Sequence, residues 1–505
     1  MPMHGIGSRH PKPDSLKSPA NKNPGLFGKL FDVKPLVASD AALLELAKAM
    51  KDTGQADSKI PAGFTYHGQF IDHDITFDPT SLSEKIADPQ GKENFRTPTA
   101  DLDSLYGLGQ DGSPFLYERD PVGLHIGPKL LIGTAAASPK IVSAGTIPDQ
   151  VGHDLPRSPV TGMAIISDPR NDENLLVAQL HVAFMNFHNK VVDKLEAQGV
   201  PSNEIFAKAR ELVTWHYQWI VLHEFLETIT GEKGIAERIM KAGRKHFRFA
   251  KFPFMPIEFA VAAYRFGHSM VRQDYSHNFV FREGGATAAT LGLLFGFTAK
   301  SGQIVGGLQP PATPLPQPVL PSNWVVDWRR FFDFKTPAST PNFEFNLARK
   351  IDPFIVDALH TLPGVDPASP GAILPFRNLR RGVMMQLPSG QAVAKKMGLP
   401  ALTTAEIGGG SKPDSVVARK HGFDKATPLW YYILKEAELK GTGQHLGPVG
   451  ATIVAEVFVG LIQGNPASYL SATPKFKPSL GSTPGKFEMT DLLTFAGVVN
   501  PIGDA

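Results

Sequence analysis

The segment "HGQFIDHDIT" (residues 67–76) places two histidines and two aspartates among three large apolar side chains, which normally occupy a protein interior. If the segment is helical, Gln69 and His73 lie four residues apart and share a face. Asp72 and Asp74 then project about 100° to either side of His73. Because buried charges need partners, this pattern predicts a functional turn rather than a solvated helix end, which is the alternative.

The bulk composition describes an ordinary globular protein. The 505 residues are 42% hydrophobic and 20% charged, with a formal net charge of +3. Such a nearly balanced charge predicts no nucleic-acid partner. The chain has no cysteine, which excludes disulfides, thiolate catalysis, iron–sulfur clusters and cysteine-ligated metal or haem.

The N-terminal residues 1–24 are polar and proline-rich, so we expect a flexible or surface-hugging arm followed by one domain over residues 25–505. No apolar run suits a signal peptide or a membrane span. The sequence therefore predicts a soluble protein, cytoplasmic or exported without a classical signal peptide. The proline-rich stretch 306–323 is interpreted as a surface loop of that domain rather than a linker.

Helical patterns dominate the rest of the chain, and the predicted class is mainly α with few short strands. A helix over 39–50 is expected to begin at Ser39 as N-cap. The segment 78–160, rich in Pro, Gly, Asp and Ser, predicts long structured loops. The other expected helices are 172–199, 202–231, 256–272, 378–397, 414–436 and 450–463.

Two further segments carry polar groups next to apolar helices. "DPRNDEN" (168–174) contains Arg170 and places Glu173 in the expected first turn of a helix, although a simple capping segment would look the same. His268 follows Gly267 on an otherwise apolar helix. Glycine inside a helix costs about 1 kcal/mol relative to alanine, so close approach of a flat cofactor is one explanation. A structural histidine at a helix crossing is the other.

"TPTADLDS" (97–104) alternates hydroxyl and carboxylate side chains at Thr97, Thr99, Asp101 and Asp103. Hard oxygen ligands at every second residue suit calcium. The segment lacks the EF-hand pattern, so an ordinary acidic turn is the alternative.

Four other histidines form pairs with a spacing of seven, His181 with His188 and His216 with His223. A dimetal helical bundle would need Glu-x-x-His spacing, and Glu224 directly follows His223 instead. We interpret these four histidines as structural.

Taken in order, "GQFIDHDITFDPT", "DPRNDEN…FHNKV", "YRFGH" and "RNLRRG" resemble the animal-type haem peroxidases of the peroxidase–cyclooxygenase superfamily. The resemblance runs from residues 26–32 to the C-terminal helices. The chain looks like a bacterial member of the superfamily. It implies a single large helical domain with haem b between central helices. It also implies reduction of hydrogen peroxide through a ferryl intermediate, oxidation of small organic or (pseudo)halide donors, and a role in oxidative stress. Partner proteins stay unknown.

The resemblance also implies roles for individual residues. His73 matches the distal histidine and Gln69 its neighbour above the haem, while Arg170 matches the distal arginine. His268 matches the proximal iron ligand, and Asn378 the asparagine that accepts a hydrogen bond from that ring.

The remaining matches concern the haem edge and a metal ion. Asp72 and Glu173 match carboxylates that form ester links to the haem in animal members, and Arg265 matches an arginine near a haem propionate. The residues that match a calcium site are Asp74, Thr97, Thr99, Asp101 and Asp103.

Two departures bear on the activity. Asn174 stands where one animal member has a haem-bonded methionine, which disfavours strong chloride oxidation. Fatty-acid dioxygenases of the superfamily carry a tyrosine at the position of Arg265, and we expect the adjacent Tyr264 to point elsewhere. The alternatives to a peroxidase are therefore a fatty-acid dioxygenase and a non-catalytic, calcium-stabilised interaction protein.

Overall fold

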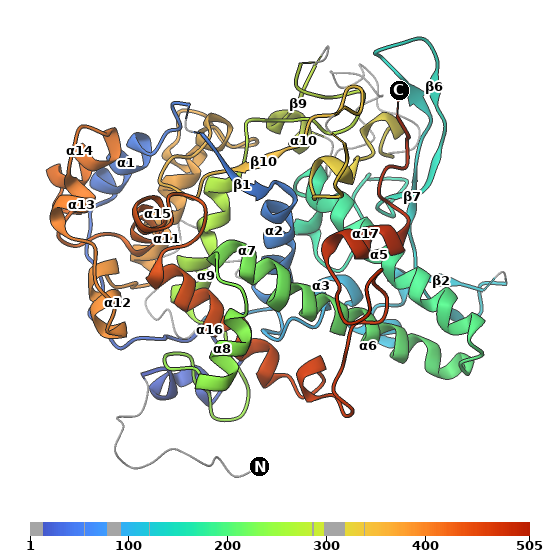
Figure 1. The fold of residues 1–505 in the computed structure, drawn as a ribbon, viewed down its shortest axis with the longest axis horizontal. Helices are drawn as coiled ribbons and strands as arrows, with labels where there is room; N and C mark the ends of the chain where they lie inside the picture. The colour runs from blue at the N-terminus through green and yellow to red at the C-terminus, as the bar shows by residue number, and fades with distance from the viewer. Residues whose placement is uncertain are drawn as a thin grey trace.

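The computed structural model describes residues 14–54, 56–77, 92–120, 122–284, 287–296, 319–337 and 339–504. Within these ranges the chain is mainly helical, and its strands are short and paired two by two (Figure 1). The prediction of a mainly α class with few short strands is thereby confirmed.

A long buried helix, α5 (Leu175–Ala197), forms the centre of the molecule. It packs against α2 (Gly63–Ile75), α6 (Ser202–Ile220) and α17 (Met489–Ala496). The helix begins later than predicted because residues Pro169–Asp172 form a separate 3₁₀ turn, η5. Asn174 is the N-cap, and its side chain accepts a hydrogen bond from the Val177 N–H. Glu173 consequently precedes the helix instead of lying in its first turn.

The second long helix, predicted over 202–231, changes character near its end. After α6 the chain makes a π-helical turn, η6 (Val221–Phe225), and then continues as α7 (Leu226–Thr230). It ends at Gly231, whose φ of 68° is the left-handed conformation that favours glycine at a helix C-terminus. The predicted end of this helix is therefore confirmed.

The prediction of a single helix over residues 256–272 is wrong. The chain forms α9 (Ile257–Ala260), leaves helical geometry at Ala262 (φ −132°, ψ −72°), and continues as a 3₁₀ helix, η7 (Ala263–Met270). In a 3₁₀ helix, side chains three residues apart eclipse each other. Arg265 and His268 therefore project in the same direction.

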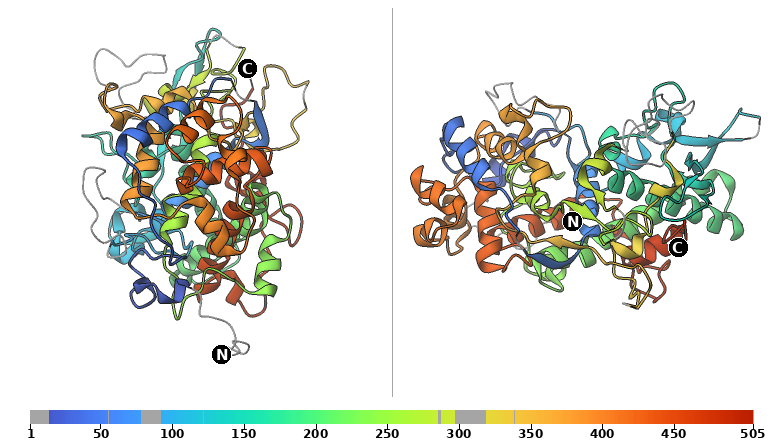
Figure 2. Two further views of the ribbon diagram at one scale, coloured as in Figure 1. Left: turned by 90° about the vertical axis from the view of Figure 1, so that its left-hand side faces the viewer. Right: turned by 90° about the horizontal axis from the view of Figure 1, so that it is seen from above.

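One side of the molecule is built from both ends of the chain. Helix α1 (Asp40–Ala49) begins at the predicted N-cap Ser39 and packs against α11 (Leu374–Met384) and α14 (Pro413–Lys420), as Figure 1 and Figure 2 show. The other helices are α3 (Asp103–Tyr106), α4 (Gly109–Gly112), α8 (Ile235–Ala242), α10 (Leu291–Gly296), α12 (Gly390–Met397), α13 (Thr404–Gly408), α15 (Leu429–Lys440) and α16 (Pro448–Gly464).

All the strand pairs are antiparallel. The most distant in sequence is β1 (Asp57–Pro61) with β10 (Leu347–Arg349). Residues 78–160 were predicted to form long structured loops. The described part of this segment also contains the short helices α3 and α4 and several paired strands of two to five residues. The other pairs are β2 (Tyr117–Arg119) with β3 (Ile126–Leu130), β4 (Gly133–Ala135) with β7 (Gln150–Asp154), β5 (Ser138–Pro139) with β6 (Thr146–Ile147), and β8 (Asp274–Tyr275) with β9 (Ala289–Thr290).

The N-terminal segment follows the surface from residue 14 onward. Ser15 is buried and its hydroxyl accepts a hydrogen bond from the Arg248 N–H at 2.9 Å, while Asn21 accepts one from the Ala250 N–H at 2.8 Å. Residues 1–13 of the predicted arm, and residues 306–318 of the predicted surface loop, lie outside the described residues. The division at residue 24 stays a prediction.

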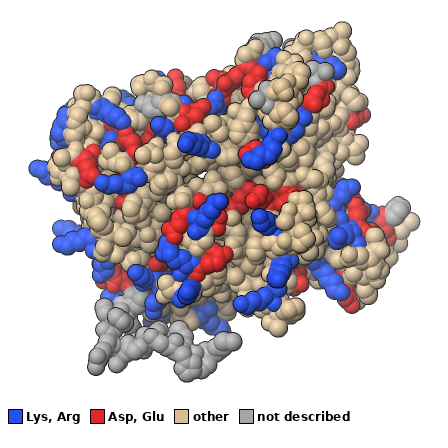
Figure 3. Space-filling model, viewed as in Figure 1, with Lys and Arg blue, Asp and Glu red and all other residues tan. Residues whose placement is uncertain are grey.

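On the face shown in Figure 3, acidic and basic side chains are interspersed, as the nearly balanced net charge suggests. Among the described helices, none has both the length and the apolar character needed to cross a bilayer.

Candidate active site

A cavity of about 310 Å³ lies between α2, the start of α5, η7 and α11. Its size falls at the lower end of the range for ligand-binding cavities. Phenylalanine and leucine side chains form much of the wall. The predicted site residues that line it are Gln69, Asp72, His73, Glu173, Arg265 and His268.

His73 is held by an amide that determines which ring nitrogen carries the proton. Asn171 Oδ1 lies 2.8 Å from His73 Nδ1, and Asn171 Nδ2 lies 2.9 Å from His181 Nδ1. The amide nitrogen donates to His181, so the amide oxygen accepts from the Nδ1–H of His73. The lone pair of the neutral ring is then left on Nε2, and His73 lines the cavity. Burial, reinforced by Arg170, lowers the pKa of His73 to about 3, so the ring is neutral at pH 7.

Gln69 is oriented by a second amide. Its Oε1 accepts a hydrogen bond from Asn174 Nδ2 at 3.0 Å. Asn174 also caps α5 through its own oxygen, so a single side chain begins the central helix and fixes Gln69. The Nε2 group of Gln69 is left as a donor at the cavity wall.

Two carboxyl groups face the same cavity. Burial raises the pKa of Asp72, despite the charges of Arg170 and Arg265 and a hydrogen bond from Thr76. Burial also raises the pKa of Glu173, to about 7. A wall with two acids that are reluctant to ionise suits an uncharged partner or covalent attachment better than a free cation.

Arg170 lies beside the cavity but is not part of its wall. Its guanidinium donates to both carboxylate oxygens of Asp168, at 3.0 and 2.7 Å, and to the His73 carbonyl oxygen at 2.9 Å. It also lies over the Phe77 ring, 4.5 Å from the centroid. In this arrangement the arginine clamps the end of α2 instead of reaching into the cavity.

His268 contacts Asn378 as the resemblance implies, but the amide is oriented the other way. Asn378 Nδ2 lies 2.8 Å from His268 Nδ1, while Asn378 Oδ1 accepts a hydrogen bond from Arg265 Nη1 at 2.9 Å. An amide nitrogen can only donate, so His268 Nδ1 accepts and the proton of the neutral ring sits on Nε2. Burial, with a contribution from Arg265, lowers the pKa of His268 to about 3.

Tyr264 corrects one sequence-based expectation. The 3₁₀ geometry of η7 brings Tyr264 into the wall of the same cavity instead of pointing it elsewhere. Its hydroxyl donates to the Gly68 carbonyl oxygen at 3.0 Å, and its ring stacks on Phe259.

Sequence reasoning missed three contributors to this site. Asn171 and His181 fix the tautomer of His73, and Arg377 lines the cavity from α11. Asn171 belongs to "DPRNDEN" and Arg377 to "FRNLRRG", so the quoted motifs contained both. His181 was interpreted as merely structural, because its contact with Asn171 comes from the fold. The other paired histidines bond mainly to neighbouring backbone or side chains.

The residues present fit a flat prosthetic group. A Cβ added to Gly267, next to His268, would meet nothing within 4 Å, so open space borders the backbone there. Arg377 Nε is buried without a hydrogen-bond partner at the cavity wall, as expected of a group that meets an anionic substituent. A haem group offers both the flat face and the carboxylates.

A second cluster lies beneath His73. Asp74, Asp101 and Asp103 each offer an oxygen within 4.8 Å of the others. Burial and mutual repulsion raise the pKa of Asp103 to about 6 and that of Asp74 well above its ordinary value. Ala100 and Leu102 adopt positive φ angles of 51° and 59°, which turn the loop so that its acids face inward. Thr97 and Thr99 hydrogen-bond to Asp103 and Asp101 respectively.

Comparisons with known proteins agree with this geometry. Residues 93–288 match the family model of the animal haem peroxidases. A "peroxidase-like protein" of Margaritifera margaritifera is 31% identical over 110 residues, which span 21% of this chain and 14% of that protein. These findings support the resemblance: residues 93–288 of this chain are similar to the animal haem peroxidases. That the chain is bacterial stays a prediction.

Solved structures show the same fold at low sequence identity. Peroxidase A from Dictyostelium discoideum has a TM-score of 0.62 at 15% identity, with 95% of this chain and 94% of that chain covered. Fatty acid alpha-dioxygenase from Oryza sativa has a TM-score of 0.59 at 12% identity, with 94% and 79% covered. The enzyme from Arabidopsis thaliana has a TM-score of 0.54 at 13% identity, with 94% and 76% covered. The fold is thus shared by peroxidases and dioxygenases.

Proposed function

We propose that this chain is a haem peroxidase that reduces hydrogen peroxide and oxidises small organic or (pseudo)halide donors. The observation that carries the proposal is the neutral His73 in the cavity wall, whose Nδ1 proton is held by Asn171 so that the lone pair is left on Nε2. This arrangement is the one that a general base for peroxide requires.

Haem b would supply the iron that binds peroxide and takes up its oxidising equivalents. His73 Nε2 accepts the proton from one peroxide oxygen and returns it to the other, which leaves as water. Because burial lowers the pKa of His73 to about 3, the ring is unprotonated across the neutral range and carries the proton only during the transfer. The hydrogen bond to Asn171 keeps the ring from turning during both transfers.

Negative charge on the departing oxygen needs a donor. Arg170 is committed to Asp168, so we assign direct contact with peroxide to the Nε2 group of Gln69, whose oxygen is already held by Asn174. Arg170 acts through its field and through its hydrogen bond to the His73 carbonyl. A donor that is fixed before the reaction avoids reorganisation during it.

His268 would ligate the iron through Nε2, and the ring must then carry its proton on Nδ1. This change requires the Asn378 amide to turn over so that its oxygen accepts from Nδ1. Arg265 would then bind one haem propionate instead of Asn378, and Arg377 would bind the second propionate. Asp72 and Glu173 are the carboxyl groups that would form ester links; haem that extracts completely into acidified organic solvent would contradict these links.

We also propose that calcium binds at Asp74, Asp101 and Asp103, with Thr97 and Thr99 completing the loop. Burial raises the pKa of Asp74 and of Asp103, and neighbouring carboxylates raise both further. A dication would compensate this repulsion. Asp74 follows His73 directly, so the ion would fix the turn that carries the base. Chelation with EGTA should lower the peroxidase rate and the unfolding temperature together, and added calcium should restore both.

A fatty-acid dioxygenase remains the second candidate, because Tyr264 lines the cavity and two dioxygenases share the fold. The hydrogen bond from Tyr264 to Gly68 and the presence of Arg265 at the usual tyrosine position favour the peroxidase.

One set of measurements separates the candidates. A haem-replete preparation should show a Soret band and oxidise phenols, bromide, iodide or thiocyanate only when hydrogen peroxide is present. Oxygen consumption with a long-chain fatty acid and without a peroxidase donor would instead identify a dioxygenase. Absence of a Soret band would favour the non-catalytic interaction protein.

A further inference from the structure

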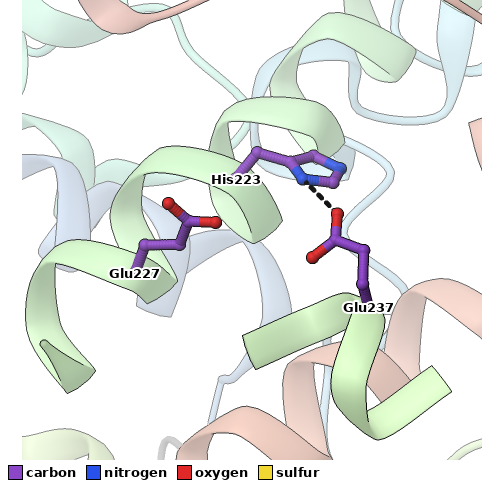
Figure 4. A group of neighbouring side chains, drawn as sticks. All are labelled: His223, Glu227 and Glu237. Atoms are coloured by element: carbon purple, nitrogen blue, oxygen red, sulfur yellow. Dashed lines mark ion pairs between the residues drawn. The ribbon is translucent and has the colours of Figure 1, made fainter. Parts of the chain in front are cut away.

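Three side chains converge at a place remote from the cavity wall: His223 in η6, Glu227 in α7 and Glu237 in α8 (Figure 4). One ring nitrogen and one oxygen from each carboxylate lie within 4.8 Å of one another. The closest pair is His223 Nδ1 and Glu237 Oε1, at 2.9 Å. The side chains come from segments on both sides of the turn at Gly231, so the fold brings them together.

The imidazole is held in one orientation. His223 Nε2 hydrogen-bonds to the Tyr469 hydroxyl at 2.8 Å, and the ring lies against Trp219 with centroids 4.0 Å apart. A histidine that binds a metal uses one ring nitrogen and generally donates its other N–H to an oxygen. Tyr469 supplies such an oxygen, which leaves Nδ1 facing the two glutamates.

The two carboxylates differ in mobility. Glu227 Oε1 accepts a hydrogen bond from the Gly234 N–H at 2.8 Å, which fixes it toward the histidine. The Glu237 side chain is 52% exposed and can adjust. Within the described ranges, no lysine or arginine is ion-paired to either glutamate, and neighbouring Arg238 is paired with Glu232. The cluster therefore combines two negative charges with an imidazole and lacks a positive partner.

We propose that His223, Glu227 and Glu237 bind a divalent transition-metal ion of the Zn²⁺ type. One imidazole with two carboxylates suits such an ion, whereas calcium prefers oxygen ligands alone. Two ligands of one zinc ion, each about 2.2 Å from it, can lie no more than about 4.4 Å apart. The three ligand atoms all lie within 4.8 Å of one another, so at most a small shift is needed, which the exposed Glu237 can provide. Water completes the coordination.

The ion would be structural. It would join the π-helical turn and α7 to α8, and through Tyr469 it would support the 3₁₀ turn Tyr469–Ser471. Phe225, two residues after His223, lines the active-site cavity. Metal binding would therefore stiffen one part of the cavity wall without contributing a group to the chemistry.

The test is a calorimetric titration of the purified full-length protein with ZnCl₂, in millimolar calcium so that the Asp74 cluster is already satisfied. We expect one saturable site. Glu227→Gln and Glu237→Gln, which keep the size of each side chain, should weaken zinc binding about tenfold or more. Glu232→Gln, which removes a nearby exposed carboxylate that pairs with Arg238, is the matched control and should bind zinc as the wild type does.

A thermal unfolding series provides a second measurement. Zinc should raise the unfolding temperature of the wild type and of Glu232→Gln, because it binds the folded state, and should not raise that of Glu237→Gln. Absence of saturable binding in the wild type would overturn the proposal and leave His223–Glu237 as an ordinary ion pair. Equal binding by Glu227→Gln, Glu237→Gln and the wild type would overturn it as well.

Discussion

The two walls of the cavity each hold a histidine against an asparagine, yet the two amides face opposite ways. Asn171 presents its oxygen to His73, because its nitrogen is engaged by His181. Asn378 presents its nitrogen to His268, because its oxygen is engaged by Arg265. The second partner of each asparagine, His181 or Arg265, thus determines the tautomer of the cavity histidine. The wall at His73 is already arranged for its proposed role, whereas the wall at His268 would have to rearrange for the proposed iron ligation.

The largest effect is expected when each of the two histidines is replaced separately. His73→Ala should keep the Soret band but slow the reaction with hydrogen peroxide by a factor on the order of a thousand, because the base is lost. His268→Ala should lose most of its haem. Stopped-flow absorbance and haem content measure the two effects. Equal behaviour of the two variants would contradict the assignment of the walls.

The next test removes the amide that fixes His73. Asn171→Leu leaves the ring without an acceptor for its Nδ1 proton, so both tautomers become populated. We expect kcat/KM for peroxide to fall about tenfold to a hundredfold with haem content unchanged, as is typical when the partner of a functional imidazole is removed. The leucine side chain branches at the same atom as asparagine, but it also leaves His181 Nδ1 without its donor. We therefore expect a lower unfolding temperature, and the unchanged haem content is the control. An unchanged rate would show that the tautomer is set elsewhere.

A smaller effect is expected at the opposite wall. Asn378→Asp replaces the amide by a group that can only accept, so the Nδ1–H form of His268 no longer requires an amide rotation. The stronger acceptor makes the imidazole a better donor to iron and should lower the Fe(III)/Fe(II) midpoint potential. Spectroelectrochemistry measures it. A potential that rises in Asn378→Asp would contradict the assignment of His268 as the iron ligand.

Much of this arrangement follows from sequence, and the exceptions have physical causes. Asp72, His73 and Asp74 could be placed on one helical turn because their spacing and apolar neighbours are local. The roles of Asn171 and Arg377 could not be recognised, because each depends on partners that only the fold brings near. The break at Ala262 was missed for the same reason: apolar periodicity does not distinguish an α-helix from the 3₁₀ helix that brings Tyr264 into the wall. The roles of the predicted site residues themselves stay proposals.

The smallest expected effect concerns a buried histidine that has no amide partner at all. His67 lies on α2 with His73, and neither of its ring nitrogens has a hydrogen-bond partner. Burial lowers the pKa of His67 from 6.5 to about 3. The unfolded chain therefore binds a proton between these values and the folded chain does not, so this residue removes stability as the pH falls below 6.5.

His67→Leu should raise the free energy of unfolding by about 1 kcal/mol at pH 7, since it removes unsatisfied polar atoms. The gain should grow by roughly 2 kcal/mol at pH 5, where the unfolded histidine is protonated. Urea unfolding at both pH values measures the difference, with the exposed His125→Leu as a control. A gain that does not depend on pH would mean that His67 is protonated, or has a bound water, in the folded state.

The wide spacing of the cavity residues along the chain has a consequence for biosynthesis. The wall draws on α2 near residue 64 and on α11 at Arg377, and β1 pairs with β10 across nearly 290 positions. During translation at about 5–20 residues per second, roughly 20–75 s pass before the last of these residues leaves the ribosome. Helix α2 can pack against α5 before then, but the cavity lacks the wall that α11 provides. Uptake of the proposed cofactor would therefore be a late event in the synthesis of this protein.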